Sequence, residues 1–150
     1  MKVPDSVQTL LPRLLETQKY AVLATENHGQ PYTSLMAFSV TEDLQSFILM
    51  TERGRLKYQN LMANPRVAIM IDNRENLGSD LEEAMAVTAQ GLAEEIAGNA
   101  RDEWRAFCLL RHPALQGFSD SPGCALIRIN VTSYVIVRCF QEVIEWRIAT

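Results

Sequence analysis

A short basic segment that follows an apolar run is the part of this sequence best suited to binding an anion. The run Phe47–Met50 is followed by Thr51 and then, around a glycine, by the cations Arg53, Arg55 and Lys57. A helix is expected to begin here, and the backbone N–H groups of a first helical turn are unpaired and partly positive. Arginine offers a forked set of donors to phosphate, lysine a mobile charge and threonine a hydroxyl. The spacing is compatible with a phosphate site, but by itself it favours a solvated turn whose charges keep the helix soluble.

Other motifs that carry chemistry are missing from the sequence. It contains neither G-x-x-x-x-G-K-[ST] nor G-x-G-x-x-G, so a P-loop and a Rossmann site are not supported, and it has no G-x-S-x-G. His28 is expected to be solvated in a turn. His112, which precedes Pro113, is interpreted as a helix-terminal residue, with a haem ligand as the less favoured alternative. We expect no metal site, and no residue stands out as an acid, base or nucleophile.

The remaining acidic and thiol groups have ordinary interpretations. Three cysteines without C-x-x-C spacing are expected to be reduced thiols of a cytoplasmic protein: Cys108, Cys124 and Cys139. Three pairs of glutamates are interpreted as hydrated surface: Glu82 with Glu83, Glu94 with Glu95, and Glu142 with Glu145.

Length and charge limit the class of protein. The 150 residues are expected to form a single domain, residues 1–150. A net charge of −4 argues against nucleic acid or an anionic membrane as the main partner. No apolar run approaches the roughly 20 residues that a membrane span needs.

The elements that must position the basic segment follow from hydrophobic periodicity. A first helix, capped by Asp5 or Ser6, is expected to be kinked at Pro12, or to begin near Pro12 itself. Further helices are expected within residues 53–64 and from Asn99 or Asp102 to His112, with a loop over residues 72–83 and a bend or bulge at Gly91. Strands are expected at residues 20–25, 32–40, 47–50, 67–71, 84–96, 124–130 and 133–146. Six or seven strands in mostly sequential order predict a mainly β fold, an antiparallel closed barrel rather than an α/β sheet.

Several stretches together resemble a known family. They are Ala21–Thr25 with Gly29-Gln30-Pro31, Ser34–Phe38, Phe47–Thr51, Arg55–Ala68 with its Asn64-Pro65-Arg66-Val67, Cys124–Arg128 and Phe140–Trp146. The sequence is similar over nearly its whole length to the pyridoxamine 5′-phosphate oxidase-like, FMN-binding split-barrel family. The resemblance implies an antiparallel split β-barrel of six or seven strands with short flanking helices. It also makes a phosphate site the favoured interpretation of the basic segment.

The resemblance further implies a flavin site and a partner. The flavin phosphate would lie near Arg55 and Lys57, with Met50 and Thr51 at the end of the preceding strand. The isoalloxazine ring would lie along Ser34, Leu35, Met36 and Ala37, partly against backbone groups. Family members are homodimers with the flavin at the subunit interface, so the second subunit should contribute to each site, with Arg138 as a candidate.

One departure from the family limits the expected reaction. Pyridoxamine-phosphate oxidases grip their substrate with an R-x-H-x-R element near the C-terminus, and the comparable stretch here, Tyr134–Phe140, has no histidine. We therefore expect an FMN-dependent oxidoreductase that acts on another small molecule. The alternatives are a flavin or haem carrier or sensor without turnover, a reductase that uses the deazaflavin F420, and a structural dimer with an empty cleft.

Overall fold

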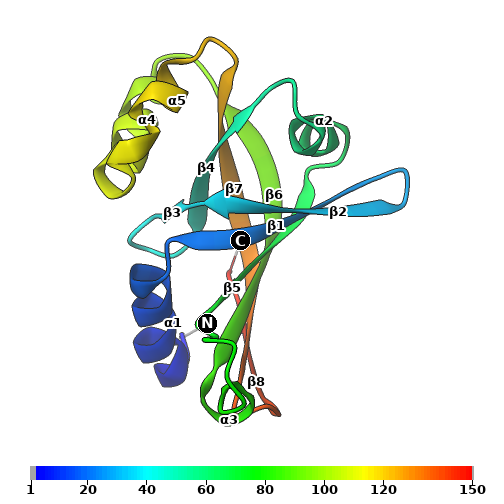
Figure 1. Cartoon of the computed structure of the whole chain (residues 1–150), viewed down its shortest axis with the longest axis vertical. Helices are drawn as coiled ribbons and strands as arrows, with labels where there is room; N and C mark the ends of the chain where they lie inside the picture. The colour runs from blue at the N-terminus through cyan, green and yellow to red at the C-terminus, as the bar shows by residue number, and fades with distance from the viewer. Residues whose placement is uncertain (1–2, 150) are drawn as a thin grey trace.

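The strands of the protein form one strongly curled antiparallel sheet in the computed structural model, which describes residues 3–149 (Figure 1). Its eight strands are β1 (Tyr20–Asn27), β2 (Gln30–Ala37), β3 (Ser39–Val40), β4 (Ser46–Glu52), β5 (Arg66–Asp72), β6 (Met85–Ile96), β7 (Cys124–Arg138) and β8 (Glu142–Arg147). They lie in the order β2-β1-β5-β6-β7-β4-β3, and β8 pairs with the second half of β7. This half-barrel with flanking helices confirms the predicted split-barrel class. The single domain predicted over residues 1–150 includes residues 1, 2 and 150, which lie outside the described range.

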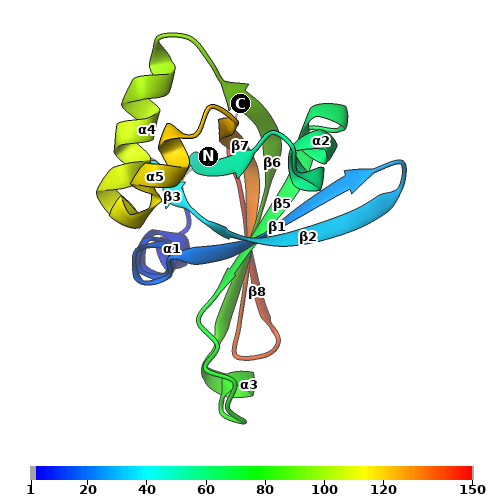
Figure 2. The same cartoon turned by 45° about the horizontal axis from the view of Figure 1, so that its top comes forward.

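Within the described residues, six short helical segments flank the sheet. They are α1 (Asp5–Thr17), α2 (Leu56–Ala63), α3 (Asp80–Glu83), α4 (Ala100–Arg111), the 3₁₀ turn η1 (Pro113–Leu115) and α5 (Gln116–Asp120). Both views place α4 and α5 on one side of β4 and α2 on the other (Figure 2). Among residues 3–149, no helix combines the length and the apolar character that crossing a bilayer would require.

The first helix confirms the predicted apolar face but begins at Asp5 itself, so Pro4, and neither Asp5 nor Ser6, occupies the N-cap position. Helix α1 runs without interruption through Pro12, so the alternative start near Pro12 is wrong. Its buried face comprises Val7, Leu11, Leu14 and Leu15. Packing of these four side chains against the sheet outweighs the one hydrogen bond that proline removes from the helix.

Strand β4 is covered on both faces, which explains its unbroken apolar sequence. Phe47 and Leu49 point into the main core, while Ile48 and Met50 pack in a second cluster beneath α4. In that second cluster Cys108 is buried, and Trp104 and Phe107 meet edge to face at 5.4 Å, as expected for one apolar face of α4. The end of β4 is therefore held rigidly between two packed layers.

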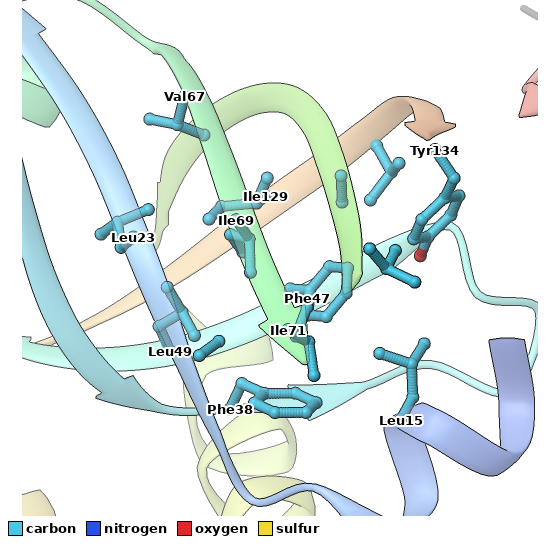
Figure 3. Close-up of a cluster of buried hydrophobic side chains, with 14 of the residues drawn as sticks. Leu15, Leu23, Phe38, Phe47, Leu49, Val67, Ile69, Ile71, Ile129 and Tyr134 are labelled. Carbon is cyan, nitrogen blue, oxygen red and sulfur yellow. The ribbon is translucent and has the colours of Figure 1, made fainter. Parts of the chain in front are cut away.

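Aromatic side chains close the main core, part of which Figure 3 shows. The rings of Phe38 and Phe47 lie 5.7 Å apart. Tyr134 stacks on Trp146 at 5.4 Å and donates its hydroxyl to the carbonyl oxygen of Leu44 at 2.5 Å. The loop before β4 is thus fixed to β7.

The predicted bulge at Gly91 is confirmed, and it corrects the prediction for β7. The register between β6 and β7 shifts at Gln90 and Gly91, which face Ser133 and Val131 and leave Thr132 as the extra residue of β7. The predicted break of the strand between residues 130 and 133 is wrong, because β7 continues through it. The polar residue Thr132 sits in the bulge, where its hydroxyl donates to Gln90 O at 3.1 Å. The chain turns instead at Cys139 and Phe140, both with left-handed backbone (φ of 49° and 64°).

Candidate functional site

A pocket of about 610 Å³ lies where β2, the end of β4 and the beginning of α2 meet. This volume falls in the usual range for sites that bind small molecules and cofactors. The segment of η1 and α5 supplies the remaining wall. The lining residues are Tyr32, Leu35, Met36, Ala37, Met50, Thr51, Glu52, Gly54, Arg55, Leu56, Lys57, Leu115 and Phe118.

The structure brings together nearly all of the residues predicted from the sequence to hold a cofactor. Those that line the pocket are Leu35, Met36, Ala37, Met50, Thr51, Arg55 and Lys57. Ser34 does not line it, although it precedes Leu35 on β2. Its hydroxyl oxygen is buried and has no hydrogen-bond partner among the described residues. The assignment of these residues to a cofactor stays a prediction.

The beginning of α2 is open to an anion. Arg55 occupies the N-cap position, and its side chain makes no capping hydrogen bond. Its backbone N–H donates to Glu52 O at 3.1 Å, but the first helical residues, Leu56 and Lys57, line the pocket without a side-chain cap. Unpaired N–H groups at a helix start favour negative charge, so this turn suits a phosphate.

The two cations of this turn repel each other. Burial lowers the pKa of Lys57, and the nearby positive charge of Arg55 lowers it further. Within residues 3–149 neither side chain takes part in a salt bridge. A bound anion would offset both effects, since an opposite charge favours the protonated amine.

Arg53, the third cation of the basic segment, is directed elsewhere. Its Nη2 forms a salt bridge of 2.8 Å with Glu95 Oε2 on β6, and its Nη1 donates to Pro122 O at 3.1 Å. Tyr58 donates its hydroxyl to the other carboxylate oxygen of Glu95 at 2.6 Å. The hydrogen bond from Arg53 is the main reason that the pKa of Glu95 lies below its ordinary value. The interpretation of Glu95 as hydrated surface is therefore wrong, because it pairs with a residue 42 positions away that spacing could not identify.

Two buried oxygen atoms at the pocket lack hydrogen-bond partners within the described part of the chain. They are Thr51 Oγ1, whose residue is 1% exposed, and Glu52 Oε2. Buried polar atoms in folded proteins are nearly always paired, so each of these oxygens is available to a water molecule or to another hydrogen-bonding group. Thr51 is predicted from its sequence context, whereas Glu52 is not, and neither are Tyr32, Leu115 and Phe118. None of these four carries a local signal beyond its place in the fold.

Two other sequence candidates lie away from the pocket lining. The Nε2 atom of His112 lies 2.7 Å from Phe38 O at the end of α4, in agreement with a helix-terminal role. Because a carbonyl oxygen only accepts, this nitrogen carries the proton. Arg138 donates to both carboxylate oxygens of Glu142, at 2.9 and 3.0 Å, in the hairpin of β7 and β8. Its predicted contribution to the site of a second subunit stays a prediction.

Comparisons with known proteins agree with this fold. A pyridoxamine 5′-phosphate oxidase homolog of Schizosaccharomyces pombe is 30% identical over 119 residues, which cover 62% of this chain and 63% of the relative. A heme-binding protein from Mycobacterium smegmatis superimposes with a TM-score of 0.81 at 19% identity, over 98% of this chain and 60% of that one. This chain thus spans less than two thirds of the length of either protein.

A FAD-binding protein from Mesorhizobium loti has a TM-score of 0.69 at 18% identity, over 84% of this chain and 88% of that one. At such identities the structural likeness concerns the fold. The family match is more direct, because residues 9–135 match the family described as pyridoxamine 5′-phosphate oxidase. These residues include the whole pocket lining and both cations of the α2 turn. The chain belongs to the pyridoxamine 5′-phosphate oxidase family.

Proposed function

We propose that this protein binds FMN in the pocket between β2, β4 and α2 and acts as an oxidoreductase on a small organic molecule. The observation that carries the proposal is the meeting of Arg55, Lys57, the uncapped start of α2 and the unpaired hydroxyl of Thr51 on one pocket wall. When bound, a flavin supplies the redox chemistry itself, as acceptor or donor of a hydride or of electrons.

The residues of the pocket would divide the work of holding FMN. Arg55 and Lys57 would bind the phosphate, with Thr51 donating its hydroxyl. The other end of the ligand would lie along β2, an edge strand whose outer backbone groups have no partner strand in the described sheet. Leu115 and Phe118 line the pocket from η1 and α5 and would exclude water from the ring.

Oxidation of pyridoxamine phosphate is not part of the proposal. The stretch of β7 that corresponds to the substrate-gripping element lacks histidine, and its first residue, Tyr134, is fully buried in the core. Its hydroxyl is already bonded to Leu44 O. The substrate is thus expected to differ from that of the named oxidases.

The visible absorption spectrum of the protein purified without added cofactor tests the proposal. Peaks of oxidised flavin support it, whereas a Soret band would show haem, and a deazaflavin spectrum would show F420. Titration of FMN by fluorescence quenching then measures affinity. The double variant Arg55→Ala with Lys57→Ala should weaken FMN binding by about 100-fold or more, since each hydrogen bond to a charged group contributes about 1.5–3 kcal/mol.

A matched double variant controls for the loss of charge. Lys19→Ala with Arg147→Ala removes two exposed cations that do not line the pocket, and it should leave FMN affinity unchanged. Undiminished binding by the first double variant would refute the site. Binding of FMN without turnover of any donor or acceptor would favour a carrier or sensor.

We also propose that the working form is a homodimer with the flavin at the interface. The support in this chain is the exposed edge strand β2, whose Tyr32 and Leu35 are 41% and 72% exposed although they line the pocket. A second copy would cover these side chains and complete the site. Size-exclusion chromatography with light scattering should give twice the mass of 16.9 kDa; a monomer at micromolar concentration would refute the dimer.

A cytoplasmic location is proposed on the cysteines. Cys108 and Cys124 are buried, Cys139 is exposed, and none forms a disulfide. Free thiols of this kind suit a reducing compartment.

A further inference from the structure

Charge is distributed unevenly over the lining of the pocket. The charged lining residues are Glu52, Arg55 and Lys57, which all come from the end of β4 and the beginning of α2. Among residues 3–149, every other side chain that lines the pocket is apolar or, in Tyr32 and Thr51, carries an uncharged hydroxyl. The pocket therefore has one charged end, which is proposed to hold the phosphate, and an uncharged remainder.

Large apolar side chains of this uncharged remainder are open to water. Leu56 of α2 is 50% exposed and Phe118 of α5 is 38% exposed, although both line the pocket. Exposed apolar side chains that gather around a pocket mark a surface for an apolar ligand. Tyr32 and Leu35 of β2 would be covered by the second copy in the proposed dimer. Leu56, Phe118 and the neighbouring Leu115 then form the apolar wall that this chain offers to a substrate.

Helix α4 fixes the position of Phe118 in this wall. The next residue, Ser119, is buried, and its hydroxyl oxygen accepts a hydrogen bond from Arg105 Nε at 2.9 Å. The same hydroxyl donates to Gln116 O at 2.8 Å, and Arg105 also forms a salt bridge with Asp120. The segment that carries the phenyl ring is thus tied to α4, so the aromatic wall is already formed before a ligand binds.

Within the described residues, no cation of the basic segment remains for a substrate with its own negative charge. Arg55 and Lys57 are proposed to bind the phosphate of the cofactor, and Arg53 is paired with Glu95 at 2.8 Å. A charge that leaves water without a partner is strongly disfavoured. A positively charged substrate is disfavoured too, because Arg55 and Lys57 would repel it. An uncharged ring gains from burial and from aromatic packing against Phe118.

We propose that the substrate is an uncharged aromatic molecule that packs against Leu115 and Phe118, and that it belongs to the quinones. A quinone accepts a hydride from the reduced flavin and a proton from water, which gives the hydroquinone and leaves the flavin oxidised. This step needs no acidic or basic side chain, and the apolar wall has none. The inference rests on the proposed function, because it names the substrate class of the same pocket.

The first test measures binding with two inert aromatic compounds that differ in charge. Naphthol is uncharged at neutral pH, whereas naphthalene sulfonate carries a negative charge on the same pair of rings. Each compound is titrated by calorimetry into the protein loaded with oxidised FMN. Naphthol should bind about tenfold or more tightly than the sulfonate, because the wall offers the sulfonate no partner.

Variants of Phe118 assign this preference to the wall. Phe118→Ala should weaken naphthol binding about tenfold, as expected when an aromatic contact is lost. Phe118→Lys supplies a cation and should reverse the preference, so that the sulfonate binds more tightly than naphthol. Loss of folding would weaken both compounds and cannot produce a reversal. Phe140→Ala removes an exposed ring that does not line the pocket, and it should change neither affinity.

The second test follows the reaction. The FMN-loaded protein is reduced with one equivalent of dithionite and mixed without oxygen with duroquinone, which has no free ring position for addition of a thiol. The rate of flavin reoxidation should saturate as the quinone concentration rises, and Phe118→Ala should raise the half-saturating concentration. A rate that rises linearly with concentration in the wild type would show collision in solution and would overturn the assignment to quinones.

The outcomes separate the inference from the proposed function. If the wild-type protein binds FMN but binds the sulfonate as tightly as naphthol, or binds neither compound, the inference is overturned and the FMN site stands. Unchanged naphthol binding by Phe118→Ala would overturn it as well. If the wild-type protein fails to bind FMN, the proposed function fails and the inference fails with it.

Discussion

The guanidinium of Arg53 and the carboxylate of Glu95 form a salt bridge of 2.8 Å that joins the turn before α2 to strand β6. The pair is partly exposed, with 39% of the Arg53 side chain and 21% of the Glu95 side chain accessible. The salt bridge therefore stabilises the turn. It also directs Arg53, one of the three cations of the basic segment, away from the pocket.

Removal of this pair should affect stability more than binding. Arg53→Ala or Glu95→Gln should lower the free energy of unfolding by about 1 kcal/mol, because a partly exposed ion pair contributes little. FMN affinity should change less than twofold. Because the pKa of Glu95 lies below its ordinary 4.5, the contribution is present above that pH and is lost as the pH falls through the lowered pKa. Urea denaturation of wild type and Glu95→Gln should thus converge in acid; a constant difference would contradict the pairing.

The unpaired hydroxyl of Thr51 predicts opposite effects on stability and on binding. Thr51→Val keeps the shape and removes a buried hydroxyl that has no partner in the described chain. The free protein should be unchanged or about 1 kcal/mol more stable, since an unsatisfied buried group is lost. FMN should bind about threefold to tenfold more weakly, because a donor to its phosphate is missing. Equal affinity in a calorimetric titration would place Thr51 outside the site.

Lys57 should give the phosphate site an alkaline limit. Burial and Arg55 lower its pKa from 10.5, so it loses its charge at a lower pH than an ordinary lysine. FMN affinity should fall as the pH rises through this lowered value. Lys57→Arg stays charged and should show a flatter profile between about pH 7 and 10. Titration of the flavin itself affects the wild type and Lys57→Arg equally, so it cancels in the ratio of their FMN affinities. Identical pH profiles would exclude Lys57 from the phosphate site.

Gly91 of β6, which lies opposite the bulge in β7, should tolerate no side chain. A Cβ there would lie 2.5 Å from Asn130 O and 2.9 Å from Ile129 Cγ2, and the backbone atom has no room to move. Gly91→Ala should cost about 1–3 kcal/mol of stability, as other overpacked sites do. Gly117→Ala, in α5 with nothing within 4 Å, should be neutral or stabilising. Thermal unfolding of both variants measures the difference.

The sequence predicts most of the fold because local patterns decide the elements. The unbroken apolar run of β4 and the glycine opposite the bulge can each be recognised in the sequence. Thr132 is misleading, because a polar residue within a long strand gives the same sequence pattern as a loop between two strands. Only its pairing with Gln90 distinguishes the two.

The residues of the candidate site are predicted where they are neighbours in sequence. They are missed where a later segment of the chain folds back against the pocket. Residues 50–57 and 35–37 lie in two short stretches, and family resemblance links them. Leu115 and Phe118 line the pocket from η1 and α5. Glu52 is positioned by Ser121 and Gly123. The diversion of Arg53 depends on Glu95, in a different strand. Such relationships depend on tertiary structure and have no signal in spacing.

The pairing of β4 with β7 determines the stage of synthesis at which the pocket can assemble. Every residue that lines the pocket lies between Tyr32 and Phe118, yet β4, which forms one wall, pairs with β7 from Ser46 with Asn130 to Glu52 with Cys124. Contacts so distant in sequence close late in folding. A nascent chain that ends at Gly123 would thus contain all the lining residues and still lack an assembled site. We expect such a truncated chain to bind no FMN in fluorescence titration. FMN would then bind only after β7 has been synthesised and has paired with β4.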